Sequence, residues 1–122
     1  MRAVVLEEKG GPEVLQIRDV PDPVPGPEEV LVDVTSTAVN RADLLQRMGL
    51  YPGPPMTHEI PGLEFAGRVA ATGERVTERQ VGDAVMGISN GGCYAERIAV
   101  HARQTMAVPD ELDLADAGAF PE

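Results

Sequence analysis

The chain has 122 residues, 43% of them hydrophobic, which suits one domain that buries about two-thirds of its unfolded surface. Ten basic residues against twenty acidic ones give a net charge of −10, which opposes phosphate backbones and anionic membranes and argues against nucleic-acid binding. No apolar run approaches the roughly 18 residues of a membrane span, and the first residues read as a strand, not as a signal peptide. A single cysteine, Cys93, rules out an internal disulfide and fits a reducing compartment, so we expect a cytoplasmic protein.

Two strands are expected near the start, at residues 2–8 and 15–20, with a turn between them where two glycines precede Pro12. The second strand alternates only roughly, which predicts an edge position or a bulge. Four prolines between positions 21 and 27 then predict an extended connection rather than a polyproline ligand for a partner.

The clearest strand and the clearest helix follow each other directly. Residues 29–39 are rich in β-branched side chains, and one face carries Val30, Val32 and Val34. Asn40 then opens a helix of about two turns, which it caps together with Asp43 in a variant of the capping box, and Gly49 is a natural C′ residue. An apolar stripe with the spacing of a packed helix face comprises Leu44, Leu45 and Met48.

The rest of the chain predicts further short strands. Residues 50–61 contain four prolines and form a loop that carries Tyr51. Asn90-Gly91-Gly92 predicts a hairpin in which residues 93–100 pair back on the strand that ends at Ile88. Other strands are expected at residues 65–72 and 105–108, and a short helix at residues 114–119. Many strands with few helices indicate one domain built as a closed or partly closed β-barrel.

Several residues that could carry chemistry also have structural explanations. Helix capping alone explains Asn40 and Asp43, and a lone tyrosine such as Tyr51 usually packs its ring and leaves its hydroxyl in water. Nothing beside Cys93 would lower its pKa into the reactive range, so a buried thiol is expected. No pair among the candidate metal ligands has a known ligand spacing; these are His58-Glu59, Cys93 and His101.

The glycines at positions 62 and 67 have the outer spacing of a phosphate loop. However, Arg68-Val69 follows where lysine and serine or threonine are needed, and the chain contains no Gly-x-Gly-x-x-Gly. We therefore expect these glycines to let backbones pack closely, and Glu64 to make a structural polar contact.

The stretch from Asn40 to Gly67 resembles the medium-chain dehydrogenase/reductase superfamily, and within it the zinc-free, NADPH-dependent quinone oxidoreductases. The segments that carry the resemblance are Asn-Arg-Ala-Asp-Leu-Leu-Gln-Arg-Met-Gly, Leu-Tyr-Pro-Gly-Pro-Pro and Ile-Pro-Gly-Leu-Glu-Phe-Ala-Gly. The resemblance covers residues 1–122 and implies a mainly β, chaperonin-10-like (GroES-like) catalytic domain, a partly open β-barrel with one or two short helices. It also implies a Rossmann nucleotide-binding domain beyond Glu122.

The resemblance assigns site residues as well. Zinc-dependent members hold their catalytic metal with a cysteine where this chain has Asn40 and a histidine where it has Leu63, so a zinc-free site is implied. Asn40 would lie near the nicotinamide and hydrogen-bond a substrate carbonyl, and Tyr51 would contact the nicotinamide and border the quinone pocket. Asp43 would lie at the same, nicotinamide end of the cofactor and would have a mainly structural role.

The function implied is hydride transfer from NADPH to a quinone or another activated carbonyl or alkene, by a homodimeric full-length enzyme. Such acceptors are electron-poor enough to need no Lewis acid. The alternatives are an enoyl or alkenal reductase of the same superfamily and a non-enzymatic GroES-like binding module. The isolated chain is expected to fold but not to catalyse. Residues 112–122 are expected to be frayed, or docked on a neighbouring molecule at high concentration, because their partner surface belongs largely to the other domain.

Overall fold

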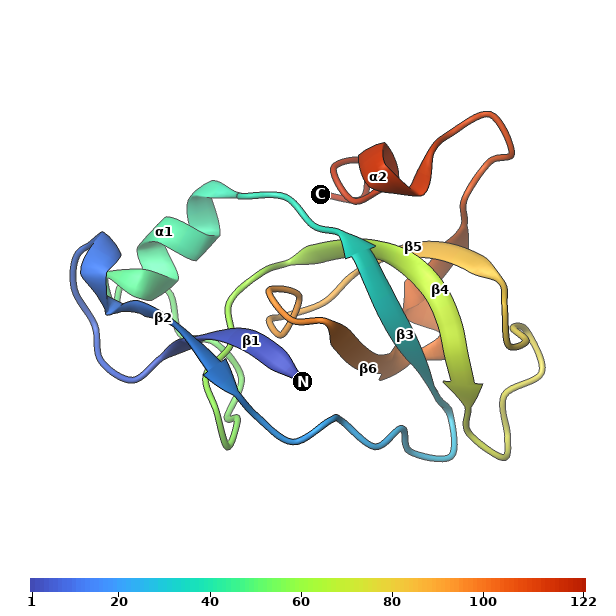
Figure 1. Ribbon diagram of the computed structural model, residues 1–122, viewed down its shortest axis with the longest axis horizontal. Coiled ribbons are helices and arrows are strands. Elements are labelled where there is room, and N and C mark those ends of the chain that lie inside the picture. The colour runs from blue at the N-terminus through green and yellow to red at the C-terminus, as the bar shows by residue number, and fades with distance from the viewer.

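The computed structural model describes residues 1–122 as two β-sheets with two short α-helices beside them (Figure 1). Neither α-helix has the length or the hydrophobicity needed to cross a bilayer. The elements in chain order are β1 (Arg2–Leu6), the 3-10 turn η1 (Pro12–Val14), β2 (Leu15–Asp19), β3 (Glu29–Ser36), α1 (Arg41–Arg47), β4 (Glu64–Thr72), β5 (Ala84–Ile88), β6 (Arg97–His101), the 3-10 turn η2 (Ala102–Gln104), β7 (Thr105–Ala107) and α2 (Leu114–Ala117).

The larger sheet has five strands in the order β6-β3-β4-β5-β7, and all neighbours are antiparallel. β1 pairs with β2 in a separate two-stranded sheet, which an isolated bridge between Ala3 and Ala95 joins to the rest. All five residues of β2 are exposed, which confirms its edge position. The barrel is therefore not closed, and the predicted mainly β, partly open architecture with one or two short helices is confirmed.

The main core is built from the strands of the larger sheet. The even-numbered face of β3 points inward as predicted, since Val30 and Val32 are fully buried and Val34 packs partly buried against the same cluster. From β4, Phe65 and Val69 join this cluster. Burying side chains of this size stabilises the fold by roughly 1.5–3 kcal/mol each before conformational entropy is counted.

The predicted hairpin at Asn90-Gly91-Gly92 is wrong in its pairing. Gly91 and Gly92 do take positive φ values of 138° and 88°, but β5 pairs with β4 and β7, whereas β6 pairs with β3. The chain leaving the turn bonds instead to the segment before β4: Gly92 N–H donates to Ile60 O at 2.7 Å, and Tyr94 N–H donates to Pro61 O at 3.0 Å. Those carbonyls satisfy the amide groups that the hairpin would have used.

The C-terminal tail docks on its own domain, so the expected fraying of residues 112–122 is also wrong. In Figure 1 α2 lies beside the end of β3, and it contacts both β3 and β4. Ser36 Oγ donates to the Leu114 carbonyl and accepts the Gly118 N–H at 3.0 Å. Ala117 is fully buried. Strand β3 thus supplies a surface that the amphipathic pattern of the tail could not identify.

Close approach of β3 and β4 gives the first prediction. A Cβ on Gly67 would overlap the carbonyl oxygen of Asp33, so Gly67→Ala should lower the free energy of unfolding by about 3 kcal/mol through backbone displacement. Gly82→Ala is the matched control, because Gly82 has a φ of 95° but open space where a Cβ would lie, and only a strain cost of about 1 kcal/mol is expected. Urea denaturation measures both; equal losses in the two variants would contradict the packing argument.

Candidate functional site

The site begins at the N-terminus of α1, where the predicted cap is present. Asn40 has extended backbone angles, φ −110° and ψ 157°, and its backbone N–H donates to Asp43 Oδ2 at 2.9 Å. The predicted capping box of Asn40 and Asp43 is present, although the contact of the Asn40 side chain with the Asp43 backbone N–H falls outside normal hydrogen-bond geometry. At the other end Gly49 takes a φ of 79°, which confirms it as the C′ residue. The capping carboxylate, more than the capping amide, therefore anchors this helix.

The buried face of α1 is polar, contrary to the packing expected for its apolar stripe. Asp43 and Gln46 are buried, whereas Leu44 and Met48 are 43% and 44% exposed. Gln46 Nε2 donates to Glu59 Oε1 at 3.0 Å, and Lys9 pairs with the same carboxylate. Hydrogen bonds hold the helix on the barrel, so Leu44 and Met48 remain at the surface while Leu45 is half-buried.

Asn40 and Glu64 form the contact at the centre of the site. Asn40 Nδ2 donates to Glu64 Oε1 at 2.7 Å, and Glu64 is only 2% exposed. The other carboxylate oxygen, Oε2, accepts the Glu122 N–H at 2.9 Å. The structural polar contact expected of Glu64 is confirmed, and its partner is the residue that the resemblance places beside the nicotinamide.

A second carboxylate, that of Asp43, pairs with a tyrosine that the sequence reasoning did not select. Tyr94 O–H donates to Asp43 Oδ2 at 2.6 Å, while Asp43 Oδ1 is buried with no hydrogen-bond partner. Tyr94 follows the turn at residues 90–92, and only its position after two glycines and the buried Cys93 could have drawn attention to it. Gly62 permits this contact, because it has a φ of 102° and a Cβ there would overlap the Tyr94 ring.

Burial controls the two weak acids of this cluster. It raises the pKa of the Cys93 thiol, and the nearby carboxylates of Asp43 and Glu64 raise it further. Burial likewise raises the pKa of Tyr94, and the hydrogen bond to Asp43 adds to the effect. Both groups are therefore neutral at physiological pH, and the predicted unreactive, buried thiol at Cys93 is confirmed.

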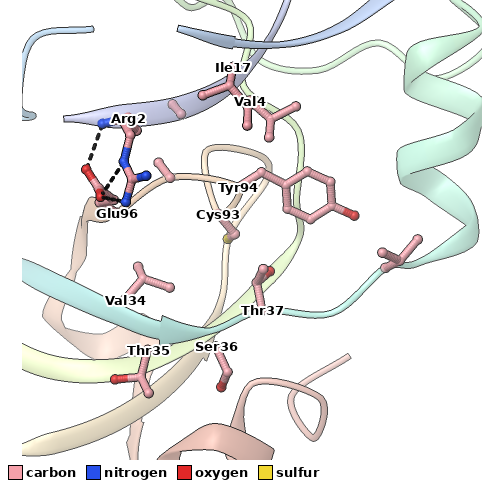
Figure 2. Close-up of a pocket in the computed structure, with 13 residues that line it drawn as sticks. Arg2, Val4, Ile17, Val34, Thr35, Ser36, Thr37, Cys93, Tyr94 and Glu96 are labelled. Carbon is pink, nitrogen blue, oxygen red and sulfur yellow. Dashed lines mark hydrogen bonds and ion pairs between the residues drawn. The ribbon is translucent and has the colours of Figure 1, made fainter. Parts of the chain in front are cut away.

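An apolar groove of about 520 Å³ opens next to this cluster, between the β1–β2 sheet and the end of β3 (Figure 2). Figure 2 shows Cys93 and the Tyr94 ring between Val4 and Ile17 on one side and Val34 and Thr37 on the other, with the Arg2–Glu96 ion pair at one end. Most of its lining is apolar: Ala3, Val4, Ile17, Val34, Val39, Cys93, Tyr94 and Ala95. Val39 precedes Asn40 directly, so the groove runs up to the start of the site without including Asn40 in its lining.

Tyr51 lies elsewhere. It is 37% exposed and lines a separate hollow of about 460 Å³ with Pro52, Gly53, Pro54 and Asn90. No hydrogen bond joins it to Asn40 or Asp43. The structure thus brings Asn40, Asp43 and Glu64 together and leaves Tyr51 on the neighbouring loop. The roles assigned to Asn40, Tyr51 and Asp43 in catalysis and cofactor binding remain predictions.

Three similarities to known proteins bear on this geometry. The family model of the alcohol dehydrogenase GroES-like domain matches residues 26–110. This chain belongs to that family. It is 39% identical over 122 residues to quinone oxidoreductase of Lama guanicoe, covering 98% of this chain and 37% of the relative. It is 36% identical over 122 residues to the human synaptic vesicle membrane protein VAT-1 homolog, covering 98% of this chain and 31% of the relative.

Solved structures agree with the sequence relatives. Escherichia coli quinone oxidoreductase, solved in complex with NADPH, superposes with a TM-score of 0.91 at 30% identity, covering 98% of this chain and 37% of that one. The GroES-like domain described here therefore spans about a third of the length of the relatives that it matches. Membership of the medium-chain dehydrogenase/reductase superfamily, whose matched members include oxidoreductases, is confirmed.

The raised pKa values of Cys93 and Tyr94 predict alkaline instability of this GroES-like domain. Their contribution to stability is full below the pKa values of the unfolded chain, about 8.5 for cysteine and 10 for tyrosine, and is lost as the pH rises beyond them. The free energy of unfolding in urea should fall from about pH 8.5 and more steeply above about pH 10. In Cys93→Ala, the loss of unfolding free energy between about pH 8.5 and pH 10 should be smaller than in the wild type. A level profile over this range would contradict the burial of both groups.

Proposed function

We propose that this chain is the catalytic domain of an NADPH-dependent quinone oxidoreductase that works without zinc. The observation that carries the proposal is the Asn40–Glu64 contact, in which a buried carboxylate holds a neutral amide. By the family resemblance, zinc-dependent members carry a cysteine at the position of Asn40. The similarity to quinone oxidoreductases, one of them solved with NADPH, supports the same conclusion. The identity of the acceptor and of the cofactor belongs to the proposal.

The residues around Asn40 do not suit a zinc ion. Zinc in proteins takes thiolate, imidazole or carboxylate ligands in a tetrahedral arrangement. Asn40 offers an amide that is already hydrogen-bonded to Glu64. Leu63, which precedes Glu64 in the chain, is buried and has no atom that could bind a metal ion. No three histidine, cysteine or acidic side chains gather closely enough anywhere in the chain to hold a metal ion. Glu64 alone is a poor substitute for a ligand set.

The same residues do suit the nicotinamide end of a dinucleotide and a carbonyl acceptor. Asn40 is partly exposed, and its amide nitrogen has two hydrogens, of which Glu64 uses one. NADPH, held mainly by a nucleotide-binding domain, would supply the hydride. The second hydrogen of Asn40 Nδ2 would orient the acceptor carbonyl and stabilise the charge that develops on its oxygen.

The alternative acceptors are the activated alkenes of an enoyl or alkenal reductase, which would use the same amide on a conjugated carbonyl. A cytoplasmic location and a homodimeric full-length enzyme are part of the proposal; the single, buried and reduced Cys93 supports the first. A non-enzymatic binding module would show no NADPH oxidation with any of these acceptors.

The full-length polypeptide that carries this domain provides the test. NADPH oxidation with 1,4-benzoquinone is expected, with well under one zinc per chain by elemental analysis after purification without added metal. The 122-residue chain alone should bind NADPH no better than millimolar, about −4 kcal/mol, because its net charge of −10 repels an anionic ligand. A stoichiometric zinc that survives a mild chelator, or micromolar NADPH binding by this chain alone, would overturn the corresponding part of the proposal.

Tyr51 tests the placement of the acceptor. In the full-length enzyme Tyr51→Ala should lower kcat/KM for quinone reduction by a factor corresponding to about 1–3 kcal/mol, through lost ring contacts and a lost hydroxyl. Because Tyr51 is 37% exposed, stability should change by less than about 0.5 kcal/mol. Tyr51→Phe is the control that keeps the ring and removes only the hydroxyl. An unchanged kcat/KM in Tyr51→Ala would limit this tyrosine to a loop-packing role.

A further inference from the structure

The carboxylate of Glu64 has a second consequence for the site. We propose that Glu64 is a positioning residue: it holds the Asn40 side-chain amide in the one orientation that presents an N–H, not a carbonyl oxygen, to the acceptor. The inference rests on the proposed function, since it concerns how Asn40 meets a carbonyl substrate. It assigns to Glu64 a role beyond the structural polar contact described above.

An asparagine amide can turn over at almost no steric cost, because its oxygen and nitrogen ends have nearly the same shape. An ionised carboxylate accepts hydrogen bonds and donates none, so it accepts the Nδ2 end and repels the Oδ1 end. The Asn40 Nδ2 to Glu64 Oε1 distance is 2.7 Å, within the range of charge-assisted hydrogen bonds, and Glu64 is 2% exposed, so water does not compete for it.

Glu64 is itself held rigidly. Its Oε2 accepts the Glu122 N–H at 2.9 Å, and its backbone carbonyl accepts the Thr37 hydroxyl at 2.6 Å. The Asn40 backbone is held separately, through its N–H to Asp43. Asp43 thus positions the main chain of Asn40, and Glu64 makes the one hydrogen bond of normal geometry to the Asn40 side-chain amide. A change at Glu64 should reorient the amide without unwinding α1.

Orientation matters because of where charge develops. In the proposed reaction, NADPH would supply a hydride to the quinone, giving a hydroquinone monoanion that a proton from solvent would complete to the hydroquinone. The negative charge collects on the carbonyl oxygen of the acceptor, which an N–H donor stabilises and an amide oxygen repels. The correct amide orientation should therefore affect kcat, while leaving the affinity for NADPH nearly unchanged.

Glu64→Gln gives a sharp test, because the Glu122 N–H is part of the backbone and cannot turn over. The single oxygen of the introduced glutamine should pair with that N–H, which leaves its NH₂ group facing Asn40 and forces the Asn40 amide to invert. In the 122-residue chain, through-hydrogen-bond NMR couplings should join Asn40 Nδ2 to the Glu64 carboxyl carbon. In the variant they should join the side-chain nitrogen of the introduced glutamine to the Asn40 carboxamide carbon.

In the full-length enzyme Glu64→Gln should lower kcat for quinone reduction by about 100-fold, the scale of one lost donor to a developing oxyanion, with the KM for NADPH within about twofold. Ser36→Ala is the matched control: it loosens the same tail at Leu114 and Gly118 but leaves the Asn40–Glu64 contact intact, so kcat should hold. No coupling in the wild-type chain, no inversion in the variant, or an inversion without loss of kcat would each overturn the positioning role. A wild-type enzyme that oxidises no NADPH with quinone, although the coupling is present, would overturn the proposed function and with it the role inferred for Glu64.

Discussion

Two carboxylates buried beside one short helix impose the main constraint on this domain. Asp43 is 5% exposed and Glu64 is 2% exposed, and a buried carboxylate is costly unless hydrogen-bond donors surround it. The donors come from three distant parts of the chain: Asn40 at the start of α1, Tyr94 after the glycine turn, and Glu122 in the tail. These donors pair with both oxygens of Glu64 and with Oδ2 of Asp43, whereas Asp43 Oδ1 has no partner. Pairing these oxygens therefore brings together segments that no local pattern connects.

This constraint explains why α1 turns its polar face inward. A seven-residue helix contributes little stability by itself and needs tertiary contacts to persist. Asp43 and Gln46 supply those contacts through Tyr94 and Glu59, so Leu44 and Met48 stay at the surface. The stability of the site therefore depends on the geometry of these hydrogen bonds. The benefit is a fixed position for Asn40, because polar contacts are directional where apolar packing is not.

Two glycines, Gly67 in β4 and Gly62 just before it, serve the same end by allowing close contacts. Gly67 lets β4 lie against the Asp33 carbonyl of β3, and Gly62 makes room for the Tyr94 ring beside Asp43. The paired strands β3 and β4 then present Ser36 to the tail and Glu64 to Asn40. In the proposed enzyme, the core and the acceptor site would share this wall of the barrel.

Local patterns in the sequence determined most of the elements and the cap. Valine alternation identified the buried face of β3, and Asn40, Asp43 and Gly49 marked the two ends of α1, because capping and strand periodicity depend on neighbours within a few residues. The tertiary structure alone decided the other features. These are the strand pairing after Gly91 and Gly92, the inward face of α1, the docking of α2, and the roles of Tyr94 and the Glu122 N–H. Each of these features depends on a hydrogen bond to a residue in another element or loop. The periodicity of residues within one element carries no information about such distant partners.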